Sequence, residues 1–303
     1  MQKEILTFDE LTLLINSSAI SNILVLAAPI VIALVLLELG ISIWLKRNVY
    51  SLKDSFASIL IGIGSILINL VAKIFIFASI LLIYNALPWH IPFTWWSFVL
   101  CLIWMDFWRY VAHRISHESR FWWATHVVHH SSEYYNLTVA FRVSWIQHLK
   151  IVFFIPVALT GFHPVVFIIC QQIEVLYQFW VHTELIKKLP APIEYIFVTP
   201  SHHRVHHARN EKYLDKNYGS TLIIWDRMFG TFQQEEADIK LIFGITKPVK
   251  SHNFVHLVFH ETIDILSDVY KSKSLSEAWQ RTFVRPSQQA ELEAKLKANE
   301  ANK

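Results

Sequence analysis

Three groups of closely spaced histidines constrain this chain more than any other feature of its sequence. One group is a His-x3-His pair, and the other two are His-x2-His-His triplets that lie far apart in the chain. The groups are His113 and His117; His126, His129 and His130; and His203, His206 and His207. On a helix, residues three or four positions apart share a face, so the imidazoles of one group can point the same way. A fold that joins the three groups would gather eight imidazoles in one place.

Eight imidazoles are too many for one metal ion and suit two. A neutral imidazole is a good ligand for iron, zinc or copper. The plainer interpretations are histidine-rich surface helices without metal, or a structural zinc site. Structural zinc usually has four ligands, often including cysteine, whereas this pattern has eight histidines and no cysteine close to them. The sequence therefore predicts a centre that holds two metal ions.

Several further residues are candidates for supporting roles. His182 is a candidate ninth ligand, with a capping role or a role beside the ligands as the alternative; His202 is less suited to bind. Carboxylates near the groups are expected to accept the second ring N–H of the ligands, with ion pairing to nearby arginines as the alternative. These carboxylates are Asp106, Glu118, Glu133, Glu184 and Asp226. No catalytic side chain beyond the metal centre is predicted.

Long apolar runs indicate an integral membrane protein. Hydrophobic residues make up 53% of the chain and charged residues 17%, and the mean hydropathy is +0.35. Residues 23–45, broken only by Glu38, are long enough to cross a bilayer core of ~30 Å. The run 55–84 is too long for one plain span, so we expect a span that ends near Lys73 and an interfacial segment after it, or a hairpin. A third span is expected at 95–112.

Residues 148–181 form another apolar stretch, which is divided by the helix-stop signal GFHP at 161–164. Each half is barely long enough to cross a membrane. We therefore expect a helical hairpin that enters the membrane and returns to the same side, because only this return lets the last histidine triplet meet the others. The distribution of Lys and Arg places the histidines in the cytoplasm and the N-terminus outside. The paired tryptophans 95–96 and the aromatic run 121–123 are expected at the membrane interface, or as the wall of a lipid tunnel.

Other function classes find little support in the sequence. The net charge of +3 is too small to indicate nucleic acid as a partner. Cys101 and Cys170 lie in apolar runs and suggest neither a disulfide nor a CxxC site. With only seven glycines the chain has no phosphate loop, and Gly62-x-Gly64 is not a dinucleotide site. The first twenty residues do not match a signal peptide.

The histidine groups resemble the signature of the fatty acid hydroxylase/sterol desaturase superfamily. The resemblance is dense from about residue 94 to 250 and includes the segments HVVHHSSEYYNLTVAFRVS, LYQFWVHTELI, TPSHHRVHHARN and DKNYGSTLIIWDRMFGTF. These segments are most similar to the ether-lipid branch of the superfamily.

The resemblance implies two iron ions, O2 as oxidant and a lipid substrate taken from the bilayer. It carries the metal ligands onto the eight histidines of the three groups, with His182 as the ninth. The ether-lipid branch also implies tetrahydrobiopterin, or another external electron donor, as reductant. The chain has no flavin, haem or nicotinamide motif, so electrons are expected from a separate reductant or reductase.

The predicted fold class is an all-α integral membrane protein, a helical transmembrane bundle with a cytoplasmic, histidine-rich di-metal cap. The predicted parts are an N-terminal transmembrane region (1–112), a di-iron hydroxylase domain that includes the membrane hairpin (113–250), and C-terminal amphipathic helices with a charged tail (251–303). The end of this tail is expected to be frayed.

The predicted function is that of a membrane-bound di-iron monooxygenase that hydroxylates a lipid C–H bond with O2. The expected position is the ether-adjacent carbon of alkylglycerols, which releases an aldehyde. A sterol or fatty-acyl hydroxylase or desaturase is the nearest alternative. A metal-transporting membrane protein is an alternative of another class, but it would place ionisable ligands at mid-membrane depth. A non-catalytic scaffold with histidine-rich faces is the third possibility.

Overall fold

The computed structural model of the protein describes all residues except 1–4, 8, 11–12, 14–22 and 302–303. The described part is helical and contains no strand, only three isolated β-bridges. The all-α prediction is therefore confirmed for these residues. Most of the N-terminal lead before residue 23 lies outside them.

Two helices in the described part are long and apolar enough to cross a membrane. They are α2 (Ile23–Trp44) and α3 (Leu52–Ala86), with mean hydropathies of 2.7 and 2.6 over their most apolar stretches. Most of their apolar side chains face outward, as expected for contact with lipid. Helix α3 runs unbroken through Lys73, so the alternative of a hairpin was wrong. A membrane span that ends near Lys73 stays a prediction, because a long side chain within a helix can reach the interface without ending the helix. The third expected span lies within α4 (Trp95–Glu118), which is less apolar.

The stretch 148–181 folds as a helical hairpin, and its entry into the membrane stays a prediction. Its first arm is the 3-10 helix Gln147–Phe154 followed by α7 (Ile155–Leu159), and its second arm is α8 (Pro164–Trp180). The chain reverses at Gly161, where φ is +89° and a Cβ atom would meet the Trp89 side chain at 3.0 Å. The α-helix of the first arm begins at Ile155 and has Pro156 in its first turn, where proline is tolerated.

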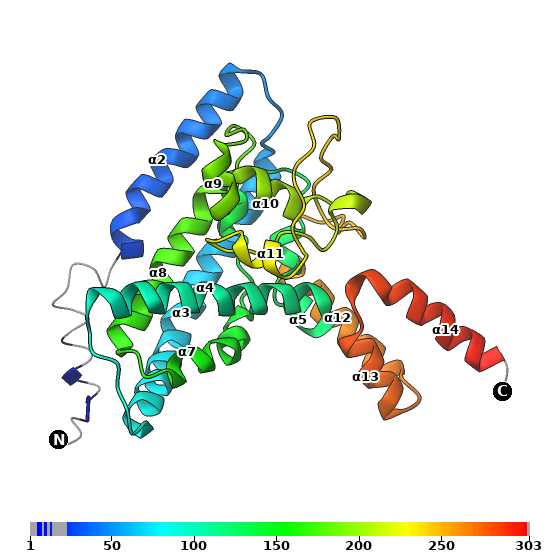
Figure 1. Ribbon diagram of the computed structural model, residues 1–303. Helices are drawn as coiled ribbons and strands as arrows, with labels where there is room; N and C mark the ends of the chain where they lie inside the picture. The colour runs from blue at the N-terminus through cyan, green and yellow to red at the C-terminus, as the bar shows by residue number, and fades with distance from the viewer. Residues whose placement is uncertain (1–4, 8, 11–12, 14–22, 302–303) are drawn as a thin grey trace.

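A buried core lies between α4 and the hairpin. Cys101 and Met105 of α4 pack against Phe167 and Cys170 of α8 and against Val157 of α7. Both cysteines are free and buried, as the sequence indicated. In Figure 1, α4 crosses the middle of the molecule in front of α3, and α2 lies along one side. The packing of α4 on α8 fixes the position of α4, whose C-terminal end carries the first histidine pair.

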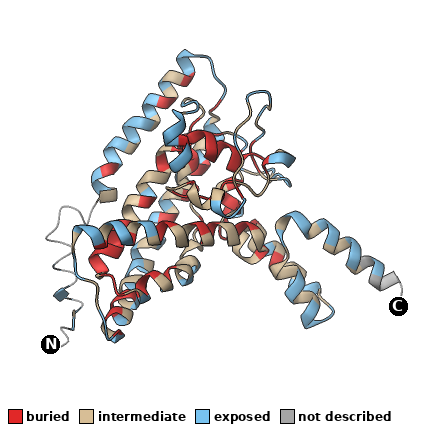
Figure 2. Ribbon diagram, in the orientation of Figure 1, coloured by how far each residue is buried: buried red, intermediate tan, exposed pale blue. Residues whose placement is uncertain are grey.

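Short helices build the cap above this core. Figure 2 shows that α10, at the centre of the cap, is among the most buried elements. The cap elements are α5 (Arg120–Trp123), α6 (Val127–His130), the 3-10 helix Leu137–Phe141, α9 (Ala191–Ile196), α10 (Pro200–His207), the 3-10 helix Glu211–Tyr213 and α11 (Ile224–Met228).

Three helices follow the cap: α12 (Phe254–Lys271), α13 (Leu275–Phe283) and α14 (Gln289–Ala301), the last two joined by the 3-10 helix Pro286–Gln288. The expectation of a frayed tail was wrong as far as Ala301, because the sequence QAELEAKLKANEA consists almost entirely of good helix formers. Leu257 and Val258 of α12 pack against Ala57 and Ile61 of α3.

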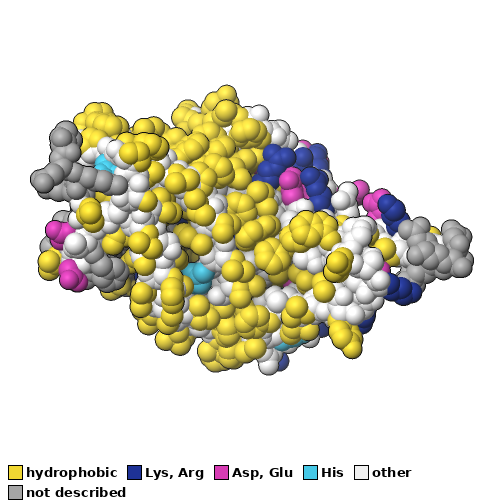
Figure 3. Space-filling model, turned by 90° about the horizontal axis from the view of Figure 1, so that it is seen from below, with side chains coloured by type: hydrophobic (Ala, Val, Ile, Leu, Met, Phe, Trp, Pro, Cys, Tyr) yellow, Lys and Arg dark blue, Asp and Glu magenta, His cyan; other side chains and the backbone are white. Residues whose placement is uncertain are grey.

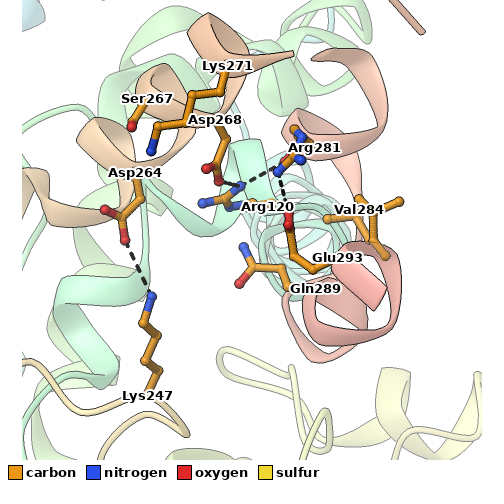
Figure 4. A pocket seen from close by; sticks show the side chains of 11 residues that line it. Arg120, Lys247, Asp264, Ser267, Asp268, Lys271, Arg281, Val284, Gln289 and Glu293 are labelled. Atoms are coloured by element: carbon orange, nitrogen blue, oxygen red, sulfur yellow. Dashed lines mark hydrogen bonds and ion pairs between the residues drawn. The ribbon is translucent and has the colours of Figure 1, made fainter. Parts of the chain in front are cut away.

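Arg120 attaches these C-terminal helices to the cap. Its guanidinium lies 2.6 Å from carboxylate oxygens of both Glu261 and Asp268 in α12, and it also donates to the Arg281 carbonyl. Figure 4 shows Arg120, Asp268 and Arg281 at the wall of a pocket of about 270 Å³. Arg281 is in turn paired with Glu293 of α14. Because these charged side chains pair with one another, the residues around the pocket hold the helices together.

The face of the molecule drawn in Figure 3 is mostly hydrophobic, with Lys and Arg gathered toward one side. Exposed apolar side chains lie on α2, α3 and the start of α4, and include Leu70, Phe75 and Trp95. Such a surface is expected for a protein that contacts lipid.

Candidate metal centre

All nine predicted ligand histidines converge in the structure, in two adjacent groups. The five-histidine group consists of His113, His117, His126, His130 and His206, and the four-histidine group consists of His129, His182, His203 and His207. Within each group the candidate ligand nitrogens all lie within 4.8 Å of one another. No other group of this kind occurs among the described residues.

Helix periodicity distributes each triplet over both groups. His126 and His130 are four residues apart and belong to the five-histidine group, whereas His129 between them points to the other group. On α10 the arrangement is reversed. His203 and His207 share a face in the four-histidine group, and His206 points to the five-histidine group. The His-x2-His-His spacing thus serves two sites at once.

The ring nitrogens are arranged as ligands around a cation. Nε2 atoms of neighbouring histidines face one another at 2.9 Å for His113 and His126 and at 3.0 Å for His182 and His203. Two neighbouring imidazoles bound to one ion at ~2.1 Å stand ~3 Å apart. Nε2 of His117 is buried with no hydrogen-bond partner, as expected for a nitrogen that binds a metal. The donor set therefore fits metal ions.

Backbone carbonyls orient three of these rings. Nδ1 of His113 donates to the Tyr218 carbonyl at 2.8 Å, and Nδ1 of His206 donates to the Lys216 carbonyl at 2.9 Å. His182 donates in the same way to the Gln178 carbonyl at 2.8 Å. A proton on Nδ1 leaves the Nε2 lone pair free for a metal.

The loop that supplies two of these carbonyls depends on left-handed residues. Asp215 and Asn217 both have φ of +57°, which these residue types tolerate better than most. The Asn217 side chain then fixes the loop, donating to the His202 and Gln233 carbonyls. The sequence analysis did not single out this loop; the signal was the DKN turn after the last triplet.

The expectation that the five selected carboxylates would orient the ligands was wrong. Asp106 accepts from the backbone of Thr221 and Leu222 and from the Trp225 indole, so it holds the cap onto α4. Glu118 is paired with Arg114, as the alternative proposed.

The other three carboxylates also have no hydrogen bond to a candidate ligand among the described residues. Asp226 accepts from the Tyr218 and Gly219 backbone, Glu133 is paired with Arg209, and Glu184 belongs to neither histidine group. Asp215, which the sequence analysis did not select, does approach a candidate ligand, with its carboxylate 3.7 Å from His117 Nδ1.

Burial keeps the imidazoles neutral. Burial, together with the neighbouring histidines, lowers the pKa of His203, His206 and His207 well below the usual 6.5. A neutral imidazole is the form that binds a metal, so the site is prepared for ligation at neutral pH.

Comparison with known proteins agrees with this geometry. Residues 98–231 match the fatty acid hydroxylase family model. All nine histidines lie within this stretch. This segment belongs to the fatty acid hydroxylase family.

Several curated proteins resemble the chain beyond the fatty acid hydroxylase segment. It is 40% identical to alkylglycerol monooxygenase of Homo sapiens over 269 residues, which cover 86% of this chain and 58% of that protein. It is 44% identical to alkylglycerol monooxygenase of Danio rerio over 231 residues, 74% of this chain and 50% of that protein. The ornithine lipid hydroxylase of Rhizobium tropici is 27% identical over 68% of this chain and 64% of its own length. The chain thus spans 58% and 50% of the length of these two alkylglycerol monooxygenases. No solved structure matches.

Aromatic side chains surround the histidines of the fatty acid hydroxylase segment. The Trp123 ring lies 4.9 Å from the His117 ring, centre to centre, so this tryptophan lines the site. The place of the aromatic run 121–123 at the membrane interface stays a prediction. Tyr135 is buried 5.2 Å from the His207 ring, and its hydroxyl donates to the Val181 carbonyl. His202 stays outside both groups and pairs with Glu194 at 3.0 Å.

Proposed function

We propose that this chain is a membrane-bound monooxygenase that hydroxylates a lipid C–H bond with O2 at a centre of two iron ions. The observation that carries the proposal is the convergence of nine imidazoles in two adjacent groups within a segment of the fatty acid hydroxylase family. Imidazole ligands suit ferrous iron. The five-histidine group would hold one ion and the four-histidine group the other.

The proposed substrate is an alkylglycerol, oxidised at the carbon next to the ether oxygen. Bound iron would supply the reductive activation of O2 that hydroxylation of an unactivated C–H bond requires. One oxygen atom enters the C–H bond, and the other leaves as water after two electrons and two protons are taken up. The product is a hemiacetal, which breaks at its C–O bond to give a fatty aldehyde and glycerol. The two electrons come from a separate reductant, tetrahydrobiopterin or another external donor.

The side chains of the protein orient the centre and exclude water. The carbonyls of Lys216, Tyr218 and Gln178 hold three rings with Nε2 toward the centre. Trp123 and Tyr135 cover the histidines and limit water at the reacting carbon. The centre is proposed to lie on the cytoplasmic side, between membrane helices and the C-terminal helices.

A sterol or fatty-acyl substrate is the nearest alternative. The identity to methylsterol monooxygenase 1 of Rattus norvegicus is 27% over 49% of this chain. This is weaker than the identity to the alkylglycerol monooxygenases, so an ether lipid is favoured. Metal transport is disfavoured because the histidines of both groups lie in the cap or at the adjoining ends of α4 and α8, and none lies on α2 or α3.

The test is turnover of an alkylglycerol by the purified protein with iron, a reduced pterin and labelled O2. Release of aldehyde that carries one labelled oxygen supports the proposal. His129→Ala removes one ligand of the four-histidine group and should abolish turnover and lower the iron content, whereas His252→Ala, outside both groups, should do neither. Hydroxylation of a sterol or an acyl chain without ether cleavage would replace the substrate assignment and leave the metal site standing.

A further inference from the structure

A buried ion pair beside the two histidine groups has one unpaired polar atom on each of its two side chains. Nε of Arg109 on α4 contacts Oε2 of Glu174 on α8 at 2.5 Å, and the Glu174 side chain is fully buried. The other atoms of the pair, Arg109 Nη2 and Glu174 Oε1, are buried without a hydrogen-bond partner. Buried polar atoms are normally paired, and leaving them unpaired is unfavourable. An unpaired donor and an unpaired acceptor in one ion pair therefore point to a ligand.

Helix register places this pair next to the metal centre. Arg109 precedes His113 by four residues on α4, so the two side chains share a face and lie ~6 Å apart along the axis. Glu174 precedes Gln178 by four residues on α8, and the Gln178 carbonyl orients His182. Each half of the pair is thus within a turn of a residue that ligates or orients the centre.

The pair is not sealed off from its surroundings. The Arg109 side chain keeps 16% of its surface exposed, which leaves a way for a ligand to reach the unpaired atoms.

We propose that Arg109 and Glu174 bind the free hydroxyls of the lipid substrate beside the metal centre. A hydroxyl both donates and accepts, whereas a guanidinium only donates and a carboxylate only accepts. The two neighbouring hydroxyls of an alkylglycerol can satisfy Nη2 and Oε1 together. They also lie only a few bonds from the ether-adjacent carbon, which matches the closeness of the pair to His113. An acyl chain offers no such partner.

This inference rests on the proposed function, because it assigns the residues that would recognise the head group. The test compares hexadecylglycerol with its di-O-methyl ether, which keeps the ether and the chain but cannot donate. We expect the wild-type enzyme to prefer the free diol in kcat/KM by ten-fold to a hundred-fold, the usual effect of a lost hydrogen bond to a charged group. Replacing both residues, Arg109→Met with Glu174→Met, should bring the preference close to one.

A matched control is the buried pair Arg142–Asp54, which also meets at 2.5 Å. Its charged atoms all have partners, including Ser58, Ser131 and Ser132. Arg142→Met with Asp54→Met should alter stability and turnover but leave the preference for the diol unchanged. The single variant Glu174→Gln keeps the shape of the side chain and should reduce the preference partly.

Binding of the two lipids to the iron-loaded protein, followed by tryptophan fluorescence, gives a readout that needs no turnover. Equal affinity and equal turnover of the two lipids by the wild-type protein would overturn the inference and leave ether cleavage standing. A preference that survives Arg109→Met with Glu174→Met would overturn it as well. If neither lipid is cleaved, the proposed function fails, and the binding comparison still decides whether the pair recognises hydroxyls.

Discussion

Glu38 is a buried carboxylate in the otherwise apolar helix α2, and its removal should loosen one half of the metal centre. Glu38 accepts hydrogen bonds from the Tyr50 hydroxyl at 2.5 Å, from the Leu137 backbone at 2.8 Å and from the Thr183 hydroxyl. Thr183 directly follows His182 of the four-histidine group. The carboxylate therefore ties α2 to the segment that delivers this ligand.

The expected cost of Glu38→Ala follows from these contacts. A hydrogen bond to a charged group contributes ~1.5–3 kcal/mol, and a buried donor left unpaired costs about 1–3 kcal/mol. Leu137 N and Thr183 Oγ1 are buried, whereas Tyr50 is half-buried and its hydroxyl can turn to water. We expect a loss of about 3–6 kcal/mol in stability for Glu38→Ala and a smaller loss for Glu38→Gln, which keeps an acceptor.

The assay is thermal unfolding in detergent, combined with iron per chain. Glu38→Ala should lower the midpoint and reduce the iron content from two ions toward one, because His182 belongs to only one group. Ser42→Ala is the control on the same helix face: the Ser42 hydroxyl is buried without a partner, so its removal should leave stability unchanged or raise it. Equal midpoints for the two variants would refute the reasoning.

Three further predictions concern other parts of the molecule. Gly64→Ala should destabilise the protein by about 1–3 kcal/mol, because the new Cβ would lie 2.3 Å from the Trp145 ring, whereas Gly40→Ala, with open space around it, should be neutral or stabilising in the same unfolding assay. The metal-free protein should lose stability as the pH falls below 6.5. The histidine pKa values are lowered in the folded state, so the unfolded chain takes up protons there that the folded chain does not, and unfolding curves at pH 7.5 and 5.5 should show the difference. Single cysteines at positions 50 and 210 should label from the same side of the membrane; labelling from opposite sides would contradict the proposed topology.

The histidine pattern was readable from sequence because helix periodicity is a local property. The spacing of His126, His129 and His130 was enough to predict that they cluster, and His182 was found because it ends an apolar segment. The division of each triplet between two groups was not predicted, because it depends on how α6 and α10 face each other. That arrangement belongs to the tertiary structure, and the spacing of the histidines in the sequence does not show it.

The partners of the ligands were the least predictable part of the site. We expected carboxylates, which can be seen in a sequence, but the rings are held by the carbonyls of Lys216, Tyr218 and Gln178. Every residue has a carbonyl, so the sequence does not show which one will be used. The Arg109–Glu174 pair was missed for a related reason: an ion pair between two helices appears only when the helices are packed.

The length of α3 has a consequence for how the protein responds to its bilayer. At ~1.5 Å per residue its 35 residues extend ~52 Å, far more than the ~30 Å of a hydrocarbon core. Its first turns hold Arg142 through Asp54, and its last turns pack Ile80 and Leu81 on the core, so the cap cannot slide along it. In a thinner bilayer the helix must tilt further or protrude. The height of the histidine groups above the lipid would then change with membrane thickness. The mismatch between helix length and bilayer thickness would therefore determine how far a substrate must move out of the bilayer to be oxidised.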